Sequence, residues 1–350
     1  MIVYTSGTTS KPKGVVTTHR NIEAQVTTLV DAWGWTGSDR ILCALPLHHV
    51  HGIINVLTCA LWAGAACEMQ EKFEAQRVWE RFVGGELTLF MGVPTMYARL
   101  AALWDRSPPE QQSVMSAACR RFRLMVSGSA ALPVQLFEKW RVISGHELLE
   151  RYGMTEIGMA LSNPLQGERR PGTVGRPLPG VEVRIVDERG SVVEPGEAGE
   201  IEVKGPGVFL EYWGKPQATV ASFRHGWFRT GDVAVVEDGY YRILGRASVD
   251  IIKTGGYKVS ALEVEEVLRA HPDVIDCAVV GVEDPEWGEV VAAAVQPRPG
   301  SDLKPETLQS WSRDRLAPYR VPRRVILLGV LPRNAMGKTV KSEVARLFAS

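Results

Sequence analysis

The chain has 350 residues, 45% of them hydrophobic, so it is long enough to bury a large core and to form two domains. Forty basic residues balance forty acidic ones, and this neutrality gives no electrostatic reason to expect a nucleic acid or an anionic membrane surface as a partner. The five cysteines lack the close paired spacing of metal ribbons and redox dithiols, which predicts reduced, buried thiols. No apolar run approaches the roughly 20 residues of a membrane-spanning helix, and no signal-peptide pattern opens the sequence.

The first part of the chain alternates short apolar runs with helical stretches. The runs at 41–45, 87–91 and 122–126 predict buried strands, and the segments between them carry apolar residues at three- and four-residue spacing. This alternation predicts a large layered α/β domain.

A β-rich subdomain is predicted from about Gly172 onward. Apolar residues at 181, 183 and 185, and again at 201 and 203, alternate mainly with charged residues, which favours a half-exposed antiparallel sheet. Asp238-Gly239 between two apolar runs predicts the two-residue turn of a hairpin.

A second domain is expected to begin near Ser248, so that residues 1–247 form the large domain and residues 248–350 a small, mobile α+β domain. Ser260, with Glu263 three positions later, predicts a helix that begins with a capping box. The elements expected after that helix are a buried strand and a second helix, at 274–282 and 308–316.

A loop rich in small and hydroxyl-bearing residues runs from Tyr4 to Gly14. Small residues let backbone N–H groups approach phosphate oxygens, hydroxyls add donors, and lysines add positive charge, so the loop predicts a polyphosphate site. Composition alone leaves a solvated loop as the commoner alternative. The candidate nucleotide-binding residues in this loop are Thr5, Ser6, Gly7, Thr8, Thr9, Lys11, Lys13 and Gly14.

The ordered string from Tyr4 to Gly14 resembles the signature loop of the adenylate-forming superfamily, which contains acyl-CoA synthetases, luciferases and the adenylation domains of peptide synthetases. Ser10 stands where that family commonly has Gly. The family's later motifs follow in the family's order, so the resemblance covers essentially the whole chain.

Two motifs in the middle of the chain imply nucleotide and metal contacts. By resemblance, Tyr152 lies against the adenine ring, Thr155 contacts the α-phosphate and Glu156 holds Mg²⁺. A Thr-Glu pair is more often a helix cap, yet a cation that bridges phosphates needs one or two such carboxylates. The resemblance further implies that Asp232 and Arg246 contact the ribose, although Asp after Gly is ordinarily a turn residue.

A glycine-rich segment further on resembles the family's hinge and the loop that follows it. Arg246 and Asp250 are separated by one residue more than in most members, so the resemblance leaves both Ser248 and Asp250 as hinge candidates. Gly255 and Gly256, which lack a Cβ atom, would let the thiol-bearing arm of coenzyme A pass close to the backbone.

Pro332 to Lys338 resembles the family's C-terminal catalytic loop, which makes Lys338 a catalytic cation beside Thr155 and Glu156. A carboxylate that attacks the α-phosphate joins two anions and expels pyrophosphate, so the protein must supply positive charge and in-line geometry. The resemblance implies that the small domain rotates between adenylation and thioester formation.

The family's acyl pocket corresponds to three unusually polar stretches, at 47–52, 92–99 and 127–131. These strings resemble those of malonyl-CoA synthetases. A dicarboxylate leaves a second carboxylate to be held, and a guanidinium grips one bidentately. The resemblance therefore assigns Arg99 to that carboxylate, with Ser129 and His48 assisting. The neighbouring histidines could instead form a metal cluster, but positions this close rarely converge on one ion.

The resemblance implies an acyl-CoA synthetase that uses ATP, Mg²⁺ and coenzyme A to activate malonate. Methylmalonate is the next candidate substrate, because enzymes discriminate against one extra methyl group on a substrate by only about 1 to 3 kcal/mol. Small molecules are the expected partners, no obligate protein partner is evident, and the animal members imply a mitochondrial location. Family members place the phosphate loop much further from their start, so we expect that an N-terminal portion of the large domain is missing. This leaves two alternatives: an inactive or partly folded fragment, and an adenylation domain that loads a carrier protein.

Overall fold

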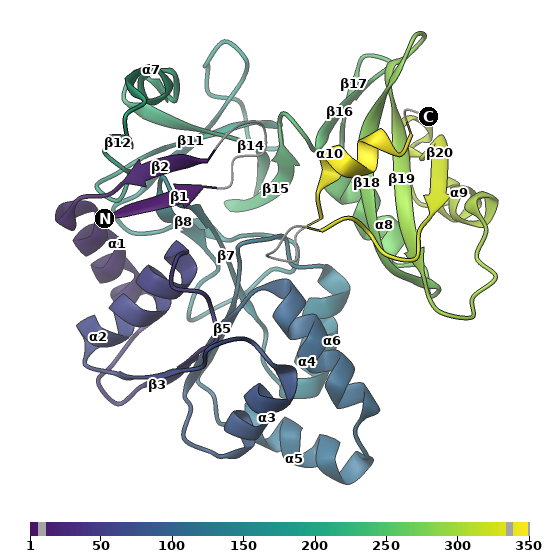
Figure 1. The fold of residues 1–350 in the computed structure, drawn as a ribbon. Coiled ribbons are helices and arrows are strands. Elements are labelled where there is room, and N and C mark those ends of the chain that lie inside the picture. The colour runs from purple at the N-terminus through teal and green to yellow at the C-terminus, as the bar shows by residue number, and fades with distance from the viewer. Residues whose placement is uncertain (6–11, 334–338, 349–350) are drawn as a thin grey trace. The chain divides into compact units, whose positions relative to one another are not determined.

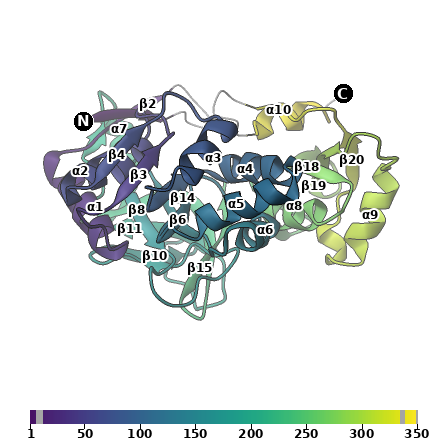
Figure 2. The same ribbon diagram turned by 90° about the horizontal axis from the view of Figure 1, so that it is seen from below.

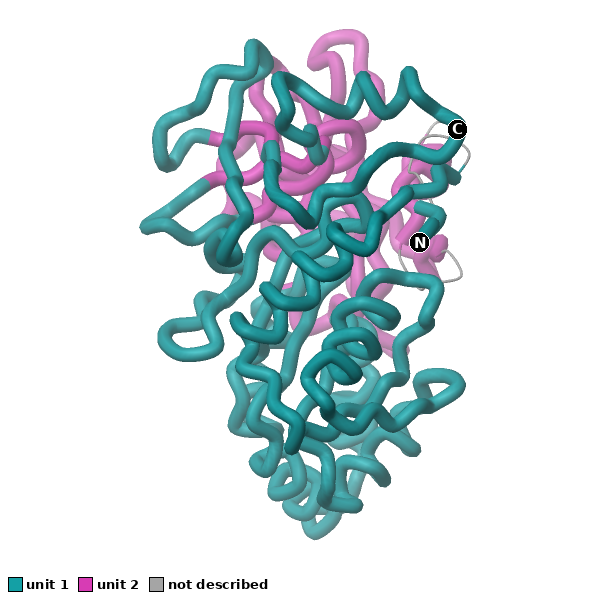
Figure 3. The backbone as a smooth tube through the Cα atoms, turned by 90° about the vertical axis from the view of Figure 1, so that its left-hand side faces the viewer, with its two compact units in different colours: residues 1–197, 201–230, 236–242 teal, residues 198–200, 231–235, 243–350 magenta. Residues whose placement is uncertain are grey.

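The computed structural model describes residues 1–5, 12–333 and 339–348. It divides into two compact units, coloured separately in Figure 3. The first unit comprises 1–197, 201–230 and 236–242, and the second comprises 198–200, 231–235 and 243–350. The domain boundary expected near Ser248 stays a prediction.

A seven-stranded sheet forms the centre of the first unit. Its strands lie in the order β4 (Ala66–Met69), β3 (Arg40–Cys43), β5 (Leu89–Gly92), β6 (Leu124–Ser127), β7 (Leu149–Met154), β8 (Gly158–Ser162) and β9 (Arg176–Pro177). The first five are parallel, whereas β8 and β9 join antiparallel. The strands expected at 41–45, 87–91 and 122–126 are therefore confirmed with small shifts at their ends.

Helices cover both faces of this sheet. Successive side chains of each strand point to opposite faces, so each face needs its own hydrophobic core. Leu89 and Met91 pack in one hydrophobic cluster, and Phe90 between them packs in the other. The first cluster includes residues of α1 (His19–Ala32), the π-helix η1 (His51–Thr58) and α2 (Cys59–Ala63). The second includes residues of α3 (Ala75–Val83), α4 (Pro94–Arg106), α5 (Pro109–Cys119) and α6 (Val134–Ser144), which lie together in Figures 1 and 2.

Two smaller sheets complete the β-rich part. One has the order β1 (Ile2–Thr5), β2 (Lys13–Val16), β12 (Glu211–Tyr212) and adjoins α7 (Pro216–Ala221). The other has the order β10 (Glu182–Val186), β11 (Gly199–Lys204), β14 (Trp227–Glu237), β13 (Phe223–Arg224), with β15 (Tyr240–Arg246) paired to β14. Asp238 and Gly239 connect β14 to β15 with φ values of 50° and 77°, so the predicted tight hairpin is confirmed.

The second unit contains a five-stranded sheet. Its strands are β17 (Tyr257–Ser260), β16 (Ile251–Thr254), β19 (Gly288–Pro297) and β18 (Val274–Asp284) in that order, with β20 (Arg324–Leu327) parallel to β19. One face packs on α8 (Ala261–Arg269) and α9 (Pro305–Arg313), and the other packs on α10 (Lys341–Arg346). A short 3₁₀ helix, Pro318–Arg320, precedes β20.

The predictions for the cap of α8, for the second helix and for the cysteines are confirmed in part. Ser260 caps α8 and accepts a hydrogen bond from the Glu263 backbone N–H at 3.2 Å, which is one half of the predicted capping box. The helix expected at 308–316 begins earlier, because Pro305 can occupy its first turn. All five cysteines are free, but Cys67 is only half-buried. None of the described helices is long and apolar enough to cross a membrane.

Candidate functional site

The β1–β2 hairpin flanks the predicted phosphate loop. Thr5 pairs with Lys13 in register, and the Thr5 hydroxyl lies 3.5 Å from the Lys13 carbonyl oxygen. Gly14 is buried, and a Cβ atom there would lie 3.0 Å from Ile2 Cγ2 and 3.3 Å from Trp213 Cβ, so this glycine permits close packing. The other predicted loop residues lie outside the described residues: Ser6, Gly7, Thr8, Thr9 and Lys11.

The tight connection between β7 and β8 carries the second motif. Tyr152 lies on β7, whereas Thr155 and Glu156 lie in the turn that follows. A Cβ atom at Gly153 would fall 2.0 Å from the Gly158 carbonyl oxygen, so the register shift at this point requires glycine. Glu156 is 5% exposed, and its carboxylate is thus held away from bulk water.

Tyr212 is a residue that the sequence reasoning missed. Its hydroxyl donates a hydrogen bond of 2.9 Å to Glu156 Oε1. The Lys13 ammonium lies over the face of the Tyr212 ring, 4.6 Å from the ring centroid. A predicted phosphate-binding cation and a predicted metal-binding carboxylate therefore contact the same tyrosine. Its neighbourhood, Phe209 to Trp213, is rich in aromatic residues and indicates a buried strand, so no polar pattern marked it.

The second unit brings together the two predicted ribose contacts. Arg246 Nε lies 3.1 Å from Asp232 Oδ1, and Asp232 is 9% exposed. The Gly231 backbone N–H donates to Glu200 Oε1 at 3.2 Å, which helps to fix the turn before Asp232. A carboxylate with two acceptor oxygens beside a guanidinium can accept hydrogen bonds from two vicinal hydroxyls.

The hinge candidates lie in the turn 247–250. Ser248 is exposed, whereas Asp250 accepts a hydrogen bond from the Arg246 backbone N–H at 2.9 Å. Lys341 Nζ lies 2.5 Å from Asp250 Oδ1 and 2.7 Å from Glu265 Oε1. Burial opposes the charge of Lys341, but the two carboxylates outweigh it and raise the pKa of its ammonium.

Gly255 and Gly256 form the exposed turn between β16 and β17, with φ values of 53° and 82°. A Cβ atom at Gly255 would lie 2.6 Å from the Trp287 ring. At Gly256 no atom of the described residues lies within 4 Å of the Cβ position. The backbone at Gly256 is therefore open to a close approach.

The polar stretches expected around the acyl group are only partly brought together. Arg99 lies on the exposed side of α4, and no ion pair or hydrogen bond joins its side chain to another part of the described chain. Ser129 has a φ of 69°, and its hydroxyl lies 3.1 Å from His51 Nδ1. His48, predicted together with Ser129 to assist Arg99, is exposed beside His49 at a ring-centroid distance of 4.3 Å.

His51 is thus the histidine that contacts Ser129, and no sequence pattern distinguishes it from His48 and His49. Burial first, and then the charges of Arg151 and His49, lower the pKa of His51 well below its ordinary value, so the imidazole is neutral. Within residues 1–5, 12–333 and 339–348, no group of three or more metal-ligating side chains gathers. A histidine metal cluster among the described residues finds no support.

The predicted catalytic lysine, Lys338, lies outside the described residues. Arg333, five residues before it, forms an ion pair with Asp276.

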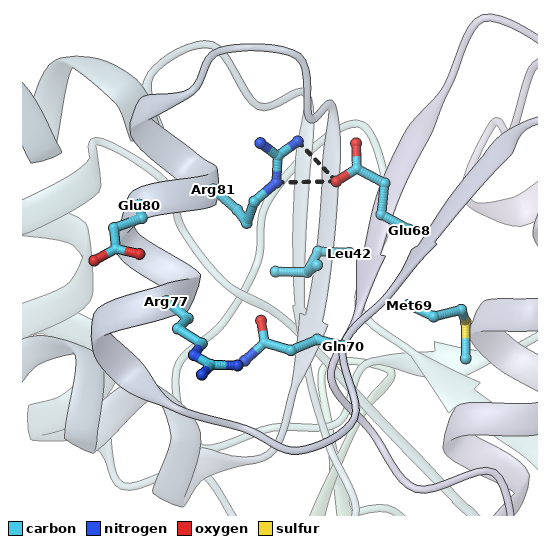
Figure 4. A pocket seen from close by; sticks show the side chains of 7 residues that line it. All are labelled: Leu42, Glu68, Met69, Gln70, Arg77, Glu80 and Arg81. Carbon is cyan, nitrogen blue, oxygen red and sulfur yellow. Dashed lines mark hydrogen bonds and ion pairs between the residues drawn. The ribbon is translucent and has the colours of Figure 1, made fainter.

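A pocket beside β4 and α3 is shown in Figure 4, where the Arg81 guanidinium donates to Glu68 Oε2 at 2.7 and 3.0 Å. None of the predicted site residues that the structure describes lines this pocket.

Comparison with known proteins identifies the class. Residues 1–213 match the family of AMP-binding enzymes, and residues 263–338 match the C-terminal domain of AMP-binding enzymes. The chain therefore belongs to the AMP-binding enzyme family. The predicted fold, a large α/β domain followed by a smaller α+β domain, is that of the solved adenylate-forming enzymes.

Within that family, the chain is similar to malonate–CoA ligases. It is 54% identical to the mitochondrial malonate–CoA ligase ACSF3 of Mus musculus over 99% of this chain and 64% of the relative, and 54% identical to that of Homo sapiens over 99% and 65%. The ATP-bound structure of MatB from Rhodopseudomonas palustris superposes with a TM-score of 0.92 at 38% identity, over 99% of this chain and 67% of that one. The chain spans less than two thirds of the length of these ACSF3 relatives.

Proposed function

We propose that this protein is an ATP-dependent acyl-CoA synthetase that activates malonate as an acyl-adenylate and transfers it to coenzyme A, releasing AMP and pyrophosphate. The observation that carries the proposal is the 54% identity to malonate–CoA ligases across 99% of the chain. Methylmalonate is a second substrate candidate, since a solved malonyl-CoA ligase 42% identical to this chain contains methylmalonyl-CoA and AMP. The names of the animal relatives support a mitochondrial location.

The proposal keeps the nucleotide contacts predicted from the motifs, and the close pairing of Asp232 with Arg246 supports one of them. The paired Asp232 and Arg246 would bind the ribose, and Tyr152 the adenine ring. Thr155 and the loop that Thr5 and Lys13 flank would contact the phosphates. Gly255 and Gly256 would admit coenzyme A, and the turn containing Ser248 and Asp250 would supply the hinge.

The residues present fit a magnesium ion. Mg²⁺ takes oxygen ligands and is usually held by one or two carboxylates together with substrate phosphates and water. Glu156 is a buried carboxylate in the turn that carries Thr155, so it would hold the ion. When bound, the ion would neutralise developing negative charge on the phosphates.

The activity is tested with the purified 350-residue chain. Release of AMP should require ATP, malonate and coenzyme A together, and should be much weaker with acetate in place of malonate. Adenylate formation without transfer to coenzyme A would favour an adenylation domain that loads a carrier protein. Nucleotide binding without any turnover would favour an inactive fragment.

Arg99→Met should raise the KM for malonate about ten- to a hundredfold, because a hydrogen-bonded charge pair with the distal carboxylate is lost. The KM for ATP should change little. Steady-state kinetics check both values, with Arg106→Met as a matched control, since Arg106 is also exposed on α4. Unaltered malonate kinetics in Arg99→Met would refute the assignment.

Glu156→Gln should raise the Mg²⁺ concentration that half-activates adenylation about tenfold, since a charged metal ligand becomes neutral. Excess Mg²⁺ should restore part of the rate. A Mg²⁺ titration of pyrophosphate release checks this, with Glu147→Gln as an exposed control. If both variants titrate like the unchanged protein, Glu156 does not carry the metal.

A further inference from the structure

The segment from Phe209 to Trp213 is hydrogen-bonded to two predicted parts of the nucleotide site. On one side, the backbone N–H groups of Leu210 and Trp213 donate to the carbonyl oxygens of Val16 and Gly14, both on β2, at 2.9 and 2.8 Å. On the other side, the Phe209 N–H donates to the Glu156 carbonyl oxygen at 2.7 Å. Figure 1 shows β12 of this segment beside β2 and β1.

Tyr212 projects from this segment and is itself held firmly. Its backbone N–H donates to Thr219 Oγ1 at 2.9 Å, and its carbonyl oxygen accepts from the Lys215 N–H at 2.9 Å. It is 5% exposed, and its ring packs against Phe209 with 4.7 Å between the centroids. A side chain held in this way can impose its position on the groups that it contacts.

From this arrangement we propose that Tyr212 is a positioning residue, which holds the Glu156 carboxylate in place relative to Lys13 so that metal and phosphate are bound together. The inference rests on the proposed function, in which Glu156 holds the metal. The phenol fixes one carboxylate oxygen through its hydrogen bond of 2.9 Å. The same ring attracts the Lys13 ammonium at 4.6 Å, and a hydroxyl that donates to a carboxylate makes the ring face more electron-rich.

Two substitutions separate the two contacts. Tyr212→Phe keeps the ring and removes the hydrogen bond to Glu156, so it should weaken metal-dependent ATP binding about tenfold, the usual cost of losing a hydrogen bond to a charged group. Metal-free ATP binding should hardly change. Tyr212→Leu also removes the ring face beneath Lys13, and should weaken metal-free ATP binding as well.

Tyr240→Phe is the matched control. Tyr240 is 4% exposed, its hydroxyl donates to the Glu168 carbonyl oxygen at 2.9 Å, and the Arg170 guanidinium lies 4.3 Å from its ring centroid. Loss of its hydroxyl removes a partly buried hydrogen bond of the same length, but affects neither Glu156 nor Lys13. It should leave the metal dependence of ATP binding unchanged.

The measurements are calorimetric titration of ATP into the 350-residue chain, with and without Mg²⁺, and electron paramagnetic resonance of Mn²⁺ bound in the presence of ATP. In a Glu156→Gln background, Tyr212→Phe should cause no further loss of metal dependence, because the two residues act through one contact. A tenfold loss that persists in that background overturns the inference, as does a Tyr212→Phe effect no larger than that of Tyr240→Phe.

The experiment uses no carboxylic acid substrate, so its outcome is separate from that of the malonate assay. A chain that binds metal–ATP with the expected Tyr212 dependence, yet releases no AMP with malonate, would contradict the proposed substrate and leave this inference standing. A chain without any metal-dependent ATP binding would contradict both.

Discussion

Lys338→Ala is expected to slow formation of the acyl-adenylate about a hundred- to a thousandfold, the usual effect of removing one preorganised group that stabilises developing charge. The lysine's charge is needed only while the phosphoryl group gains negative charge during displacement of pyrophosphate. Attack of the coenzyme A thiol on the acyl-adenylate has no such requirement at the phosphate. Thioester formation from supplied malonyl-adenylate should therefore persist.

The two half-reactions can be measured separately. Pyrophosphate release reports the first, and consumption of the free thiol with synthetic malonyl-adenylate reports the second. Lys304→Ala is a suitable control, since this lysine is exposed and its ion pair with Asp302 is long, at 3.9 Å. An equal loss of both half-reactions in Lys338→Ala would contradict the separation of the two chemistries, and would indicate that the terminal loop has a structural role instead.

Most of the fold followed from local patterns in the sequence. The buried strands were recognisable because parallel strands covered on both faces read as continuous apolar runs, and the Asp238-Gly239 turn was recognisable because few residues adopt positive φ values easily. The C-terminal limit of α9 was predicted less well, because helix ends depend on capping contacts that apolar spacing does not encode. The strand order β4-β3-β5-β6-β7 is a tertiary property that no local pattern specified.

The functional site, too, was predicted from the sequence only in part. Asp232 and Arg246 were predicted as a pair from their places in a series of motifs, and the structure brings them within 3.1 Å. Tyr212 was missed because its importance comes from Glu156, 56 residues away in the chain, and not from its neighbours. His51 was not singled out because three histidines so close in sequence look alike until the backbone places one ring against Ser129, and the role of His48 stays a prediction.

Lys341→Met is expected to destabilise the second unit by about 3 to 5 kcal/mol, the usual cost of removing one partner from a buried ion pair. The side chains of Lys341 and Asp250 are 12% and 16% exposed, so the substitution would leave the Asp250 carboxylate without its cation where water barely reaches it, whereas Glu265 keeps an ion pair with Arg269 at 3.0 Å. The Asp250 carboxylate also binds the Arg246 backbone N–H, so the turn 247–250 should loosen at the same time. Lys304→Met, at an exposed ion pair, should cost less than about 1 kcal/mol.

The effect of Lys341→Met should not depend on pH between about pH 7 and pH 9, and the sign follows from the pKa. Because the folded protein raises the pKa of Lys341 above its ordinary value of 10.5, the ammonium contributes its full stabilisation below that value, and loses it only as the pH rises through the higher pKa of the folded state. Urea unfolding monitored by hydrogen–deuterium exchange in β16, β18 and β19 would measure the loss at each pH. Adding Asp250→Asn to Lys341→Met should recover part of the stability, since the stranded charge is removed with its partner. If the double variant is as unstable as the sum of its single changes, Lys341 stabilises the unit by packing and not by its charge.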